Sequence, residues 1–332
     1  MRTRRPLFVA LAGILFSWVA AATLAAPDAA RDQSGAPAQA PVPPGLPASL
    51  RVLPQIVHPL TDSIYWIFGP TSSNNSNNGV IIGRDGVILF DTKNTLEDEK
   101  TLLARVAEIT DKPITTVILS HSDGDHINGL PALPKGVAII AQQYCKMAME
   151  ASIARGGPGA ANPDYLPTKT FDKRESLTVH GVRLELYHFA PAHTGGDTVL
   201  YLPESKIVFM GDIVLAEQND PLMHMNNGAS PQGIVDSIKG MIALDSNTYV
   251  SGHGTLVPKV ELQRRLAYQE DRISKVKALV AQGKSLSEVQ EALGEPVAPP
   301  TGLGTYTDNI YIELTRKVAF LASLAIFPFT TN

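Results

Sequence analysis

A six-residue segment, His121 to His126, carries two imidazoles and two carboxylates in the order His-Ser-Asp-Gly-Asp-His. It follows an apolar, β-branched run over residues 115–119, which predicts a buried strand. Side chains at a strand end are well placed to bind a ligand, because the sheet holds the strand and the loop lets several side chains converge. Imidazole nitrogen and carboxylate oxygen together suit zinc, iron or manganese. Capping a helix that begins near Ile127 would need only one of these residues, so the segment favours a metal site.

Three later loops also place a ligand-type side chain after an apolar run. His193 lies in a glycine-rich loop, Asp212 ends the strand-like run 206–210, and His253 follows Val250 between two glycines. Glycine lets the backbone come close to whatever binds beside it. A single residue of this kind would more often be structural, but four such loops in one chain predict one metal centre assembled at strand ends.

The order of these motifs resembles that of the metallo-β-lactamase superfamily, over about residues 64–258. The resemblance implies an α/β fold, a four-layer αββα metallo-β-lactamase sandwich with the metals at one edge and a helical C-terminal extension. Carried over position by position, it implies a centre with two metal ions. The first ion would be held by His121, the residue at 123 and His193, the second by Asp125, His126 and His253, and Asp212 would bridge the two.

Position 123 departs from the family motif, which is HxHxDH, because this chain has HxDxDH with Asp123 as its third residue. In the usual site two divalent cations face two carboxylates and a bridging hydroxide, which leaves one net positive charge. A third carboxylate makes the total zero. We therefore expect weaker Lewis acidity and a higher pKa for a bound water than in a histidine-rich site.

Three arrangements of metal remain open. Two zinc ions per chain can persist with Asp123 as an oxygen ligand. Alternatively, one zinc ion sits on Asp125, His126 and His253 only. In the third arrangement His121, Asp123 and His193 form a two-histidine, one-carboxylate set, which is typical of non-haem iron. Manganese suits the same kinds of ligand.

The resemblance implies a metal-dependent hydrolase that acts on a small molecule through a metal-activated water, with Asp125 as both ligand and catalytic residue that orients the water. Cyclic amides such as β-lactams, lactones, thioesters and phosphoesters are all candidate substrates. Asp123 argues against a β-lactamase in the strict sense. Two alternatives are an Fe(II) dioxygenase acting on a thiol or persulfide and a non-catalytic metal-binding protein.

Several residues outside the ligand motifs are assigned supporting roles. Asp91 resembles the family's strand-end aspartate that orients a ligand, and Asp197 either does the same or caps its own turn. His224 lies between two ligand motifs and is expected to line the substrate cleft. Lys93 is expected to be solvated, and the asparagines around position 77 lie where the family often has a mobile flap. The remaining histidines, which are not expected to be ligands, are His58, His180 and His188.

The amino terminus has the order of a secretory signal peptide. Arginines precede an apolar stretch over residues 7–22, and small residues follow, so residues 1–26 are expected to be cleaved and the protein exported to the periplasm or beyond, with no stable membrane anchor. Residues 27–50 are rich in Ala and Pro and predict a linker. We expect the catalytic domain over 51–258 and a helical extension, packed on the same domain, over 259–332.

The composition is that of a globular enzyme, with 44% hydrophobic residues among 332. The net charge of −4 argues against nucleic acid as a partner. The single cysteine, Cys145, excludes an intramolecular disulfide and is expected to be a buried structural thiol. The sequence carries no signal for an oligomeric state.

Hydrophobic periodicity predicts alternating strands and helices. Strands are expected at 63–68, 79–82, 87–90, 115–119, 137–140, 177–179, 182–189, 198–202, 206–210 and 249–250. Helices are expected at 95–109, 141–149, 231–243, 259–281, 285–293 and 308–324.

Overall fold

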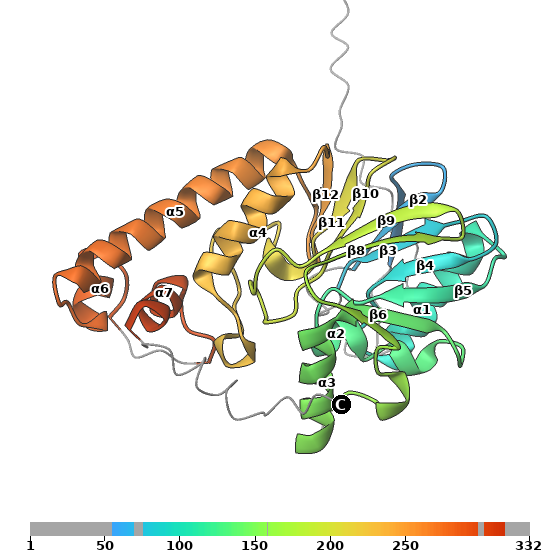
Figure 1. The fold of residues 1–332 in the computed structure, drawn as a ribbon, viewed down its shortest axis with the longest axis horizontal. Coiled ribbons are helices and arrows are strands. Elements are labelled where there is room, and N and C mark those ends of the chain that lie inside the picture. The colour runs from blue at the N-terminus through green and yellow to red at the C-terminus, as the bar shows by residue number, and fades with distance from the viewer. Residues whose placement is uncertain (1–54, 70–75, 158, 298–301, 316–332) are drawn as a thin grey trace, which may run out of the picture. The chain divides into compact units, whose positions relative to one another are not determined.

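The computed structural model describes residues 55–69, 76–157, 159–297 and 302–315, and its strands form two sheets (Figure 1). The first sheet has seven strands in the order of the chain. They are β1 (Ile56–Pro59), β2 (Ile64–Phe68), β3 (Asn78–Ile82), β4 (Val87–Phe90), β5 (Ile114–Ile118), β6 (Ala138–Gln142) and β7 (Lys169–Phe171). The second sheet has six strands in the order β13-β12-β11-β10-β9-β8. They are β8 (Arg174–Val179), β9 (Val182–Tyr187), β10 (Val199–Leu202), β11 (Ile207–Phe209), β12 (Thr248–Val250) and β13 (Leu256–Val257).

The two sheets pack face to face because both faces of their central strands are apolar. In β4, Ile88 and Phe90 lie in the core between the sheets, whereas Leu89 points to the opposite face of its sheet. Leu200 and Phe209 enter the same core from the second sheet, and the Phe90 and Phe209 rings lie 5.6 Å apart. A strand that is buried on both faces reads as a continuous apolar run, as β4 does.

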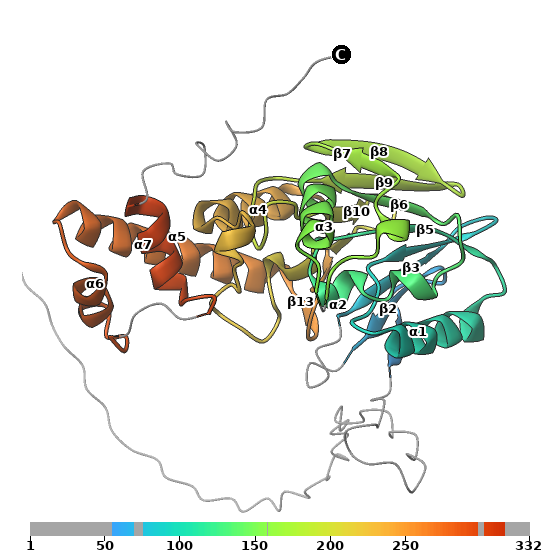
Figure 2. The same ribbon diagram turned by 90° about the horizontal axis from the view of Figure 1, so that it is seen from below.

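Helices cover the outer faces of both sheets (Figure 2). Those of the first half of the chain are α1 (Leu96–Ile109), α2 (Gly124–Ile127) and α3 (Gln143–Arg155), and those of the second half are α4 (Pro231–Ala243), α5 (Lys259–Ala281), α6 (Leu286–Ala292) and α7 (Tyr306–Thr315). The buried side chains of α1 and α3 join the first sheet's outer core, and those of α4 to α7 join the second sheet's. The predicted αββα sandwich is confirmed.

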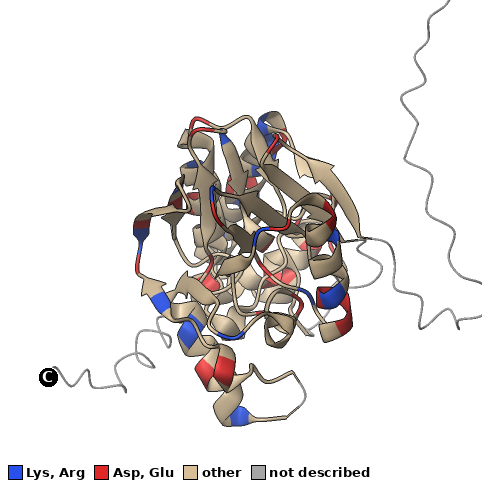
Figure 3. Cartoon of the chain, turned by 90° about the vertical axis from the view of Figure 1, so that its right-hand side faces the viewer, with Lys and Arg blue, Asp and Glu red and all other residues tan. Residues whose placement is uncertain are grey.

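The C-terminal helices form one packed group with the second sheet. Ile234 and Ile238 of α4 share a core with Leu262 of α5 and with Tyr306 and Ile310 of α7. In Figure 1, α4 lies between the strands and the red helix α7, and the orange helix α5 starts beside the strands and runs past α4 to α6. None of the described helices is long and apolar enough to cross a membrane. Figure 3 shows Lys and Arg and Asp and Glu scattered among other residues on this side of the molecule.

Most predicted elements are found, and the bounds of α4 and α5 agree with the sequence prediction. The pattern of α4 was clear because Ser230 caps the helix, accepting a hydrogen bond from the Gly233 amide at 3.1 Å, and proline follows. Three short strands, β1, β7 and β13, were not predicted. The predicted signal peptide and linker, and residues 316–324 of the last predicted helix, lie outside the described residues.

Candidate metal centre

Most of the predicted ligands come from loops that follow parallel strands, whereas His193 follows β9, which pairs antiparallel with both neighbours. β4 and β5 run parallel in the first sheet, and β11 and β12 run parallel in the second. The carboxyl ends of parallel neighbours meet at one sheet edge, so the loops after these strands converge. His121 and Asp123 follow β5, Asp212 follows β11 and His253 follows β12.

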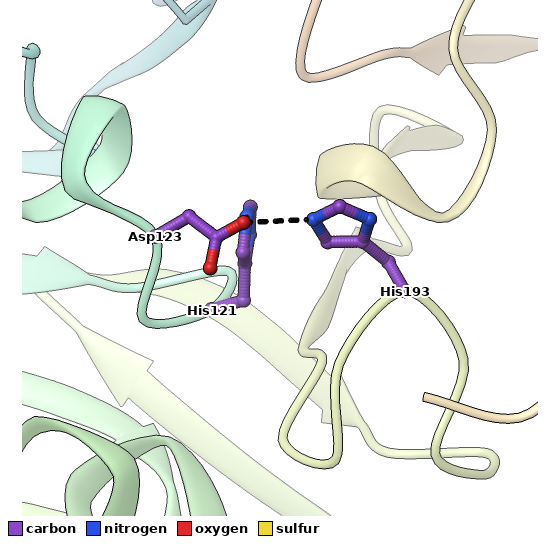
Figure 4. Close-up of side chains that lie close together, drawn as sticks. All are labelled: His121, Asp123 and His193. Atoms are coloured by element: carbon purple, nitrogen blue, oxygen red, sulfur yellow. Dashed lines mark hydrogen bonds and ion pairs between the residues drawn. The ribbon is translucent and has the colours of Figure 1, made fainter. Parts of the chain in front are cut away.

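Asp123 is the meeting point of the first predicted ligand group. Its Oδ2 atom lies 3.1 Å from His193 Nε2 and 3.5 Å from His121 Nε2 (Figure 4). The ligand atoms of these three residues all lie within 4.8 Å of one another. Both histidines are buried, and Asp123 is partly exposed.

The second predicted group assembles in the same way around Asp125 and His253. The His253 Nε2 atom lies 3.0 Å from Asp125 Oδ2 and 3.3 Å from Asp212 Oδ2. His126 Nε2 lies 3.5 Å from Asp212 Oδ1. Asp212 is also 3.9 Å from His193 Nε2, so its two oxygens face both groups. This is the position that a bridging carboxylate needs.

Several buried polar atoms at the centre have no hydrogen-bond partner among the described residues. They are Nε2 of His121, Nε2 of His126 and Oδ1 of Asp212. A buried polar atom without a partner costs about 1 to 3 kcal/mol, and three of them point into one small space. A cation would satisfy all of them, because neutral imidazole and ionised carboxylate both donate electron pairs. The residues therefore fit divalent metal.

Asp91, which follows β4, fixes the orientation of His126. Its Oδ2 atom lies 2.8 Å from His126 Nδ1, and its Oδ1 accepts the Ser120 amide at 2.6 Å. Asp91 is fully buried and has a φ of +63°, in the left-handed region that aspartate tolerates better than most residues. The contact turns Nε2 of His126 toward the other ligands, as carboxylates do beside metal-binding histidines.

The loop that carries His193 is held by Asp197 and by a later loop. Asp197 accepts hydrogen bonds from the backbone amides of Ala192 and Thr194, so its side chain closes the turn. His193 Nδ1 lies 2.8 Å from the carbonyl oxygen of Leu222. This contact leaves Nε2 free to face Asp123, which is the orientation that a ligand requires.

The pKa values of the cluster show how strongly its charges interact. Burial opposes ionisation of Asp123 and Asp212, but nearby imidazoles hold the pKa of both carboxyls well below the usual range. Burial also lowers the pKa of His193 and His253, but the carboxylates outweigh it and raise the pKa of each to about 9. The carboxylates therefore carry a negative charge that favours cations.

The family model of the metallo-β-lactamase superfamily matches residues 73–253, which is more than half of the chain. The chain belongs to that superfamily. Its members include metallo-hydrolases. The linear primary-alkylsulfatase of Pseudomonas sp. is 23% identical over 265 residues, which are 67% of this chain and 50% of that enzyme. The chain thus spans half the length of this relative.

Two solved structures of the superfamily share the fold. The stereoselective inverting sec-alkylsulfatase from Pseudomonas sp. superposes with a TM-score of 0.60 and 19% identity, covering 82% of this chain and 52% of that one. The metallo-β-lactamase from Pontibacter korlensis gives a TM-score of 0.56 and 20% identity, covering 65% of this chain and 99% of that one.

A cleft of about 510 Å³ opens over the cluster of predicted metal ligands. Its polar lining comes from Asp123, Asp125, Asp212, His224 and His253, and its apolar lining includes Leu215, Leu222 and Leu303. Leu303 precedes α7, so the C-terminal extension reaches the cleft. A second hollow of about 970 Å³, lined largely by α3, shares Asp123 and His224 with the first.

His224 lies in this cleft, where it was expected, but it also contacts a ligand directly. Its Nε2 atom lies 2.9 Å from Asp123 Oδ2, a contact that the sequence prediction lacked. Position 224 falls between two ligand motifs, and that spacing was the only sequence signal for it. His224, like His58, His180 and His188, lies in none of the described groups of metal-ligand atoms.

One expectation about a polar residue near the site was wrong. Lys93 is not solvated but buried, and its Nζ donates to the carbonyl oxygen of Ser76 while its amide donates to Glu99. Burial lowers the pKa of Lys93 to about 8 and raises that of Glu99 to about 7. Asn77, in the region where the family often has a flap, is buried.

Asn77 joins the first sheet to the loop of His253. Its backbone amide donates to Gly252, and its side-chain amide donates to the carbonyl oxygens of Ser251 and Gly254 at 2.9 and 2.8 Å. Asn78 is buried in β3, and Asn74 and Asn75 lie outside the described residues. Cys145 is buried in α3, and burial raises the pKa of its thiol.

Proposed function

We propose that this protein is a metal-dependent hydrolase with two metal ions at the described cluster. The observation that carries the proposal is the convergence of ligand-type side chains whose buried atoms lack partners. His121, Asp123 and His193 would hold one ion, Asp125, His126 and His253 would hold the other, and Asp212 would lie between them. Divalent ions bound there would polarise the scissile bond and lower the pKa of a water molecule.

Asp125 is the residue proposed to position the attacking water. Its side chain lines the cleft, and although burial opposes ionisation, the neighbouring histidines lower the pKa of the carboxyl. The ionised carboxylate accepts a hydrogen bond from a water molecule and thereby orients its lone pair toward a substrate. Asp91 supports this arrangement because its carboxylate contacts His126 Nδ1 and orients the ring.

An alkyl sulfate ester is the substrate class we propose first. The similarity to the sec-alkylsulfatase covers more of this chain than the similarity to the β-lactamase. Three leucines in the cleft suit an alkyl group. Among the described residues that line the cleft, none is Lys or Arg, so an anionic ester group would rely on the metal ions for its counter-charge. A β-lactam is the second candidate, and Asp123 weakens it.

We also propose that the protein is exported, on the charged, apolar and small-residue order of residues 1–26. Expression of the full chain in a bacterium, followed by N-terminal sequencing of the periplasmic product, tests this. A new N-terminus near Ala26 is the expected result. An intact Met1 in the cytoplasmic fraction would contradict it.

The proposal is tested by metal content and turnover in parallel. Protein purified without added metal is assayed by elemental analysis, then with decyl sulfate and with a chromogenic β-lactam. We expect about two zinc ions per chain. Asp212→Ala should abolish turnover and lower metal content, whereas the control Asp236→Ala, on the exposed face of α4, should do neither. One iron per chain with oxygen-dependent turnover would favour the dioxygenase, and bound metal without any turnover would favour a binding protein.

A further inference from the structure

We infer that His224 is a ligand of the first metal ion and replaces the imidazole that Asp123 removes from the family motif. This inference rests on the proposed metal centre. It concerns which of this chain's residues bind the ion, so its test reads metal binding rather than turnover.

The spacing around Asp123 supports a shared ion. Asp123 Oδ2 lies 2.9 Å from His224, 3.1 Å from His193 and 3.5 Å from His121, measured to Nε2 in each case. Ligand atoms at about 2.0 to 2.1 Å from one tetrahedral zinc ion lie about 3.3 Å from each other. The three contacts fall on both sides of that value, so each imidazole stands at ligand spacing from Asp123 Oδ2. His224 itself lies in none of the groups whose ligand atoms are all within 4.8 Å of one another, and Asp123 is its contact with the first group.

His224 is related to His193 much as His121 is. The rings of His193 and His224 meet edge to face at 4.9 Å and 81°, and those of His121 and His193 at 4.7 Å and 87°. The His193 ring therefore has one imidazole on each of two sides, at similar distances and angles. His224 contacts this group through Asp123.

The backbone holds His224 in place. Its amide donates to the carbonyl oxygen of His193 at 2.9 Å, and its own carbonyl accepts from Asn227 at 2.7 Å. His193 in turn contacts the carbonyl oxygen of Leu222 through Nδ1. These contacts tie the two histidine loops together. The fold therefore fixes the backbone position of His224.

The chemistry of the donor set accounts for the substitution. A histidine at position 123 would give the first site three imidazoles. With Asp123 in its place, only His121 and His193 remain, and His224 restores the third. The chain then has the usual number of imidazoles with one extra carboxylate, which suits a zinc ion that expands to five-coordination.

Zinc binding by the full-length chain tests the inference, using competition with a chromophoric chelator and the visible spectrum of the cobalt(II)-loaded protein. His224→Ala should weaken one of the two zinc sites at least 10-fold and leave the other unchanged. His224→Gln keeps a donor for Asp123 but removes the imidazole, so it should weaken the same site. Both should change the cobalt spectrum. Asn226→Ala, in the same loop, should change neither readout.

The Asp123→His background supplies the decisive comparison. There His224→Ala should change zinc affinity less than 3-fold, because position 123 again provides the imidazole. Several results would overturn the inference. They are an unchanged cobalt spectrum in His224→Ala, full zinc affinity in His224→Gln, an equal loss in both backgrounds, and no metal at the first site of the native chain. Thermal melting of each metal-free variant checks that it is folded.

Discussion

Asp91 contacts both the backbone of the loop after β5 and the side chain of a proposed metal ligand. Its carboxylate contacts the Ser120 amide and His126 Nδ1, so one residue positions both the loop after β5 and a proposed ligand. Asp91→Asn removes the charge but keeps the size, and we expect zinc affinity at one site to fall about 10- to 100-fold. Chelator competition measures this. Asp85→Asn is the matched control, because Asp85 contacts His180 Nδ1 on the surface, and an equal loss there would contradict the assigned role.

The stability of the metal-free protein should depend on pH through His193 and His253. The pKa of each is raised to about 9, above the value of about 6.5 in an unfolded chain. The stability that these histidines contribute is therefore complete below pH 6.5 and is lost as the pH rises through 9. We expect the free energy of unfolding to fall by about 2 to 4 kcal/mol over that range after chelation.

Added zinc should have the opposite pH dependence, because its ligands must be deprotonated. The extra stability that zinc provides should grow with pH over the same range. Urea unfolding at both ends of the range, with and without zinc, measures both effects. Parallel curves with and without metal would show that the histidines do not bind zinc.

The clustering of the proposed ligands could be predicted from the sequence because each follows a predicted strand or lies in a glycine-rich loop and their order is specific. The surroundings of Lys93 and Asn77 could not. Their hydrogen-bond partners are backbone carbonyls of Ser76, Ser251 and Gly254. Every residue has a backbone carbonyl, so the residue types of the sequence do not indicate which carbonyls will accept these bonds. The contact of His224 with Asp123 was hidden for a related reason, since it depends on how two distant loops meet.

At the scale of the elements, the loop after β12 leaves no room for a side chain at Gly252. An added Cβ would lie 1.9 Å from Asp212 Oδ1 and 2.9 Å from the Gly211 carbonyl carbon. Gly252→Ala should therefore displace Asp212 and lower both metal content and turnover by at least 10-fold. Elemental analysis measures the first effect.

Gly136→Ala is the control for this variant. Gly136 has a φ of +86° and open space around it, so alanine should cost about 1 to 2 kcal/mol of stability through backbone strain alone and leave metal content intact. If Gly252→Ala kept its metal, the close packing of this loop against Asp212 would have no role in metal binding.

Long elements with strong periodicity could be predicted, and short edge strands could not. α4 combines the Ser230 cap with apolar spacing, and α5 extends its pattern over 23 residues. β1 contains four residues and ends in Pro59, and β7 has two exposed residues of three. Such strands form because a neighbouring strand offers free backbone groups, which is a property of the sheet and not of their own sequence.

At the scale of the whole molecule, the C-terminal helices bring Leu303 to the cleft of a centre that lies far away in the sequence. Tyr306 and Ile310 anchor the start of α7 in the core shared with α4 and α5. We expect Leu303→Asp to raise KM for a long alkyl sulfate about 10-fold, because it places a charge beside an apolar chain, with metal content unchanged. Turnover against a series of chain lengths measures this.

The control for this variant is Leu303→Met, which conserves volume and should behave as the native protein does. An unchanged KM for every chain length in Leu303→Asp would mean that the extension takes no part in binding substrate.

The contacts of Asn77 join the two sheets next to His253. The loop that carries this histidine is thus already closed by three hydrogen bonds to carbonyl oxygens of residues 251, 252 and 254. Metal uptake then requires no ordering of the loop, so its observed rate should rise linearly with zinc concentration and show no plateau. The rate of metal binding is then set by the encounter between the folded chain and the ion.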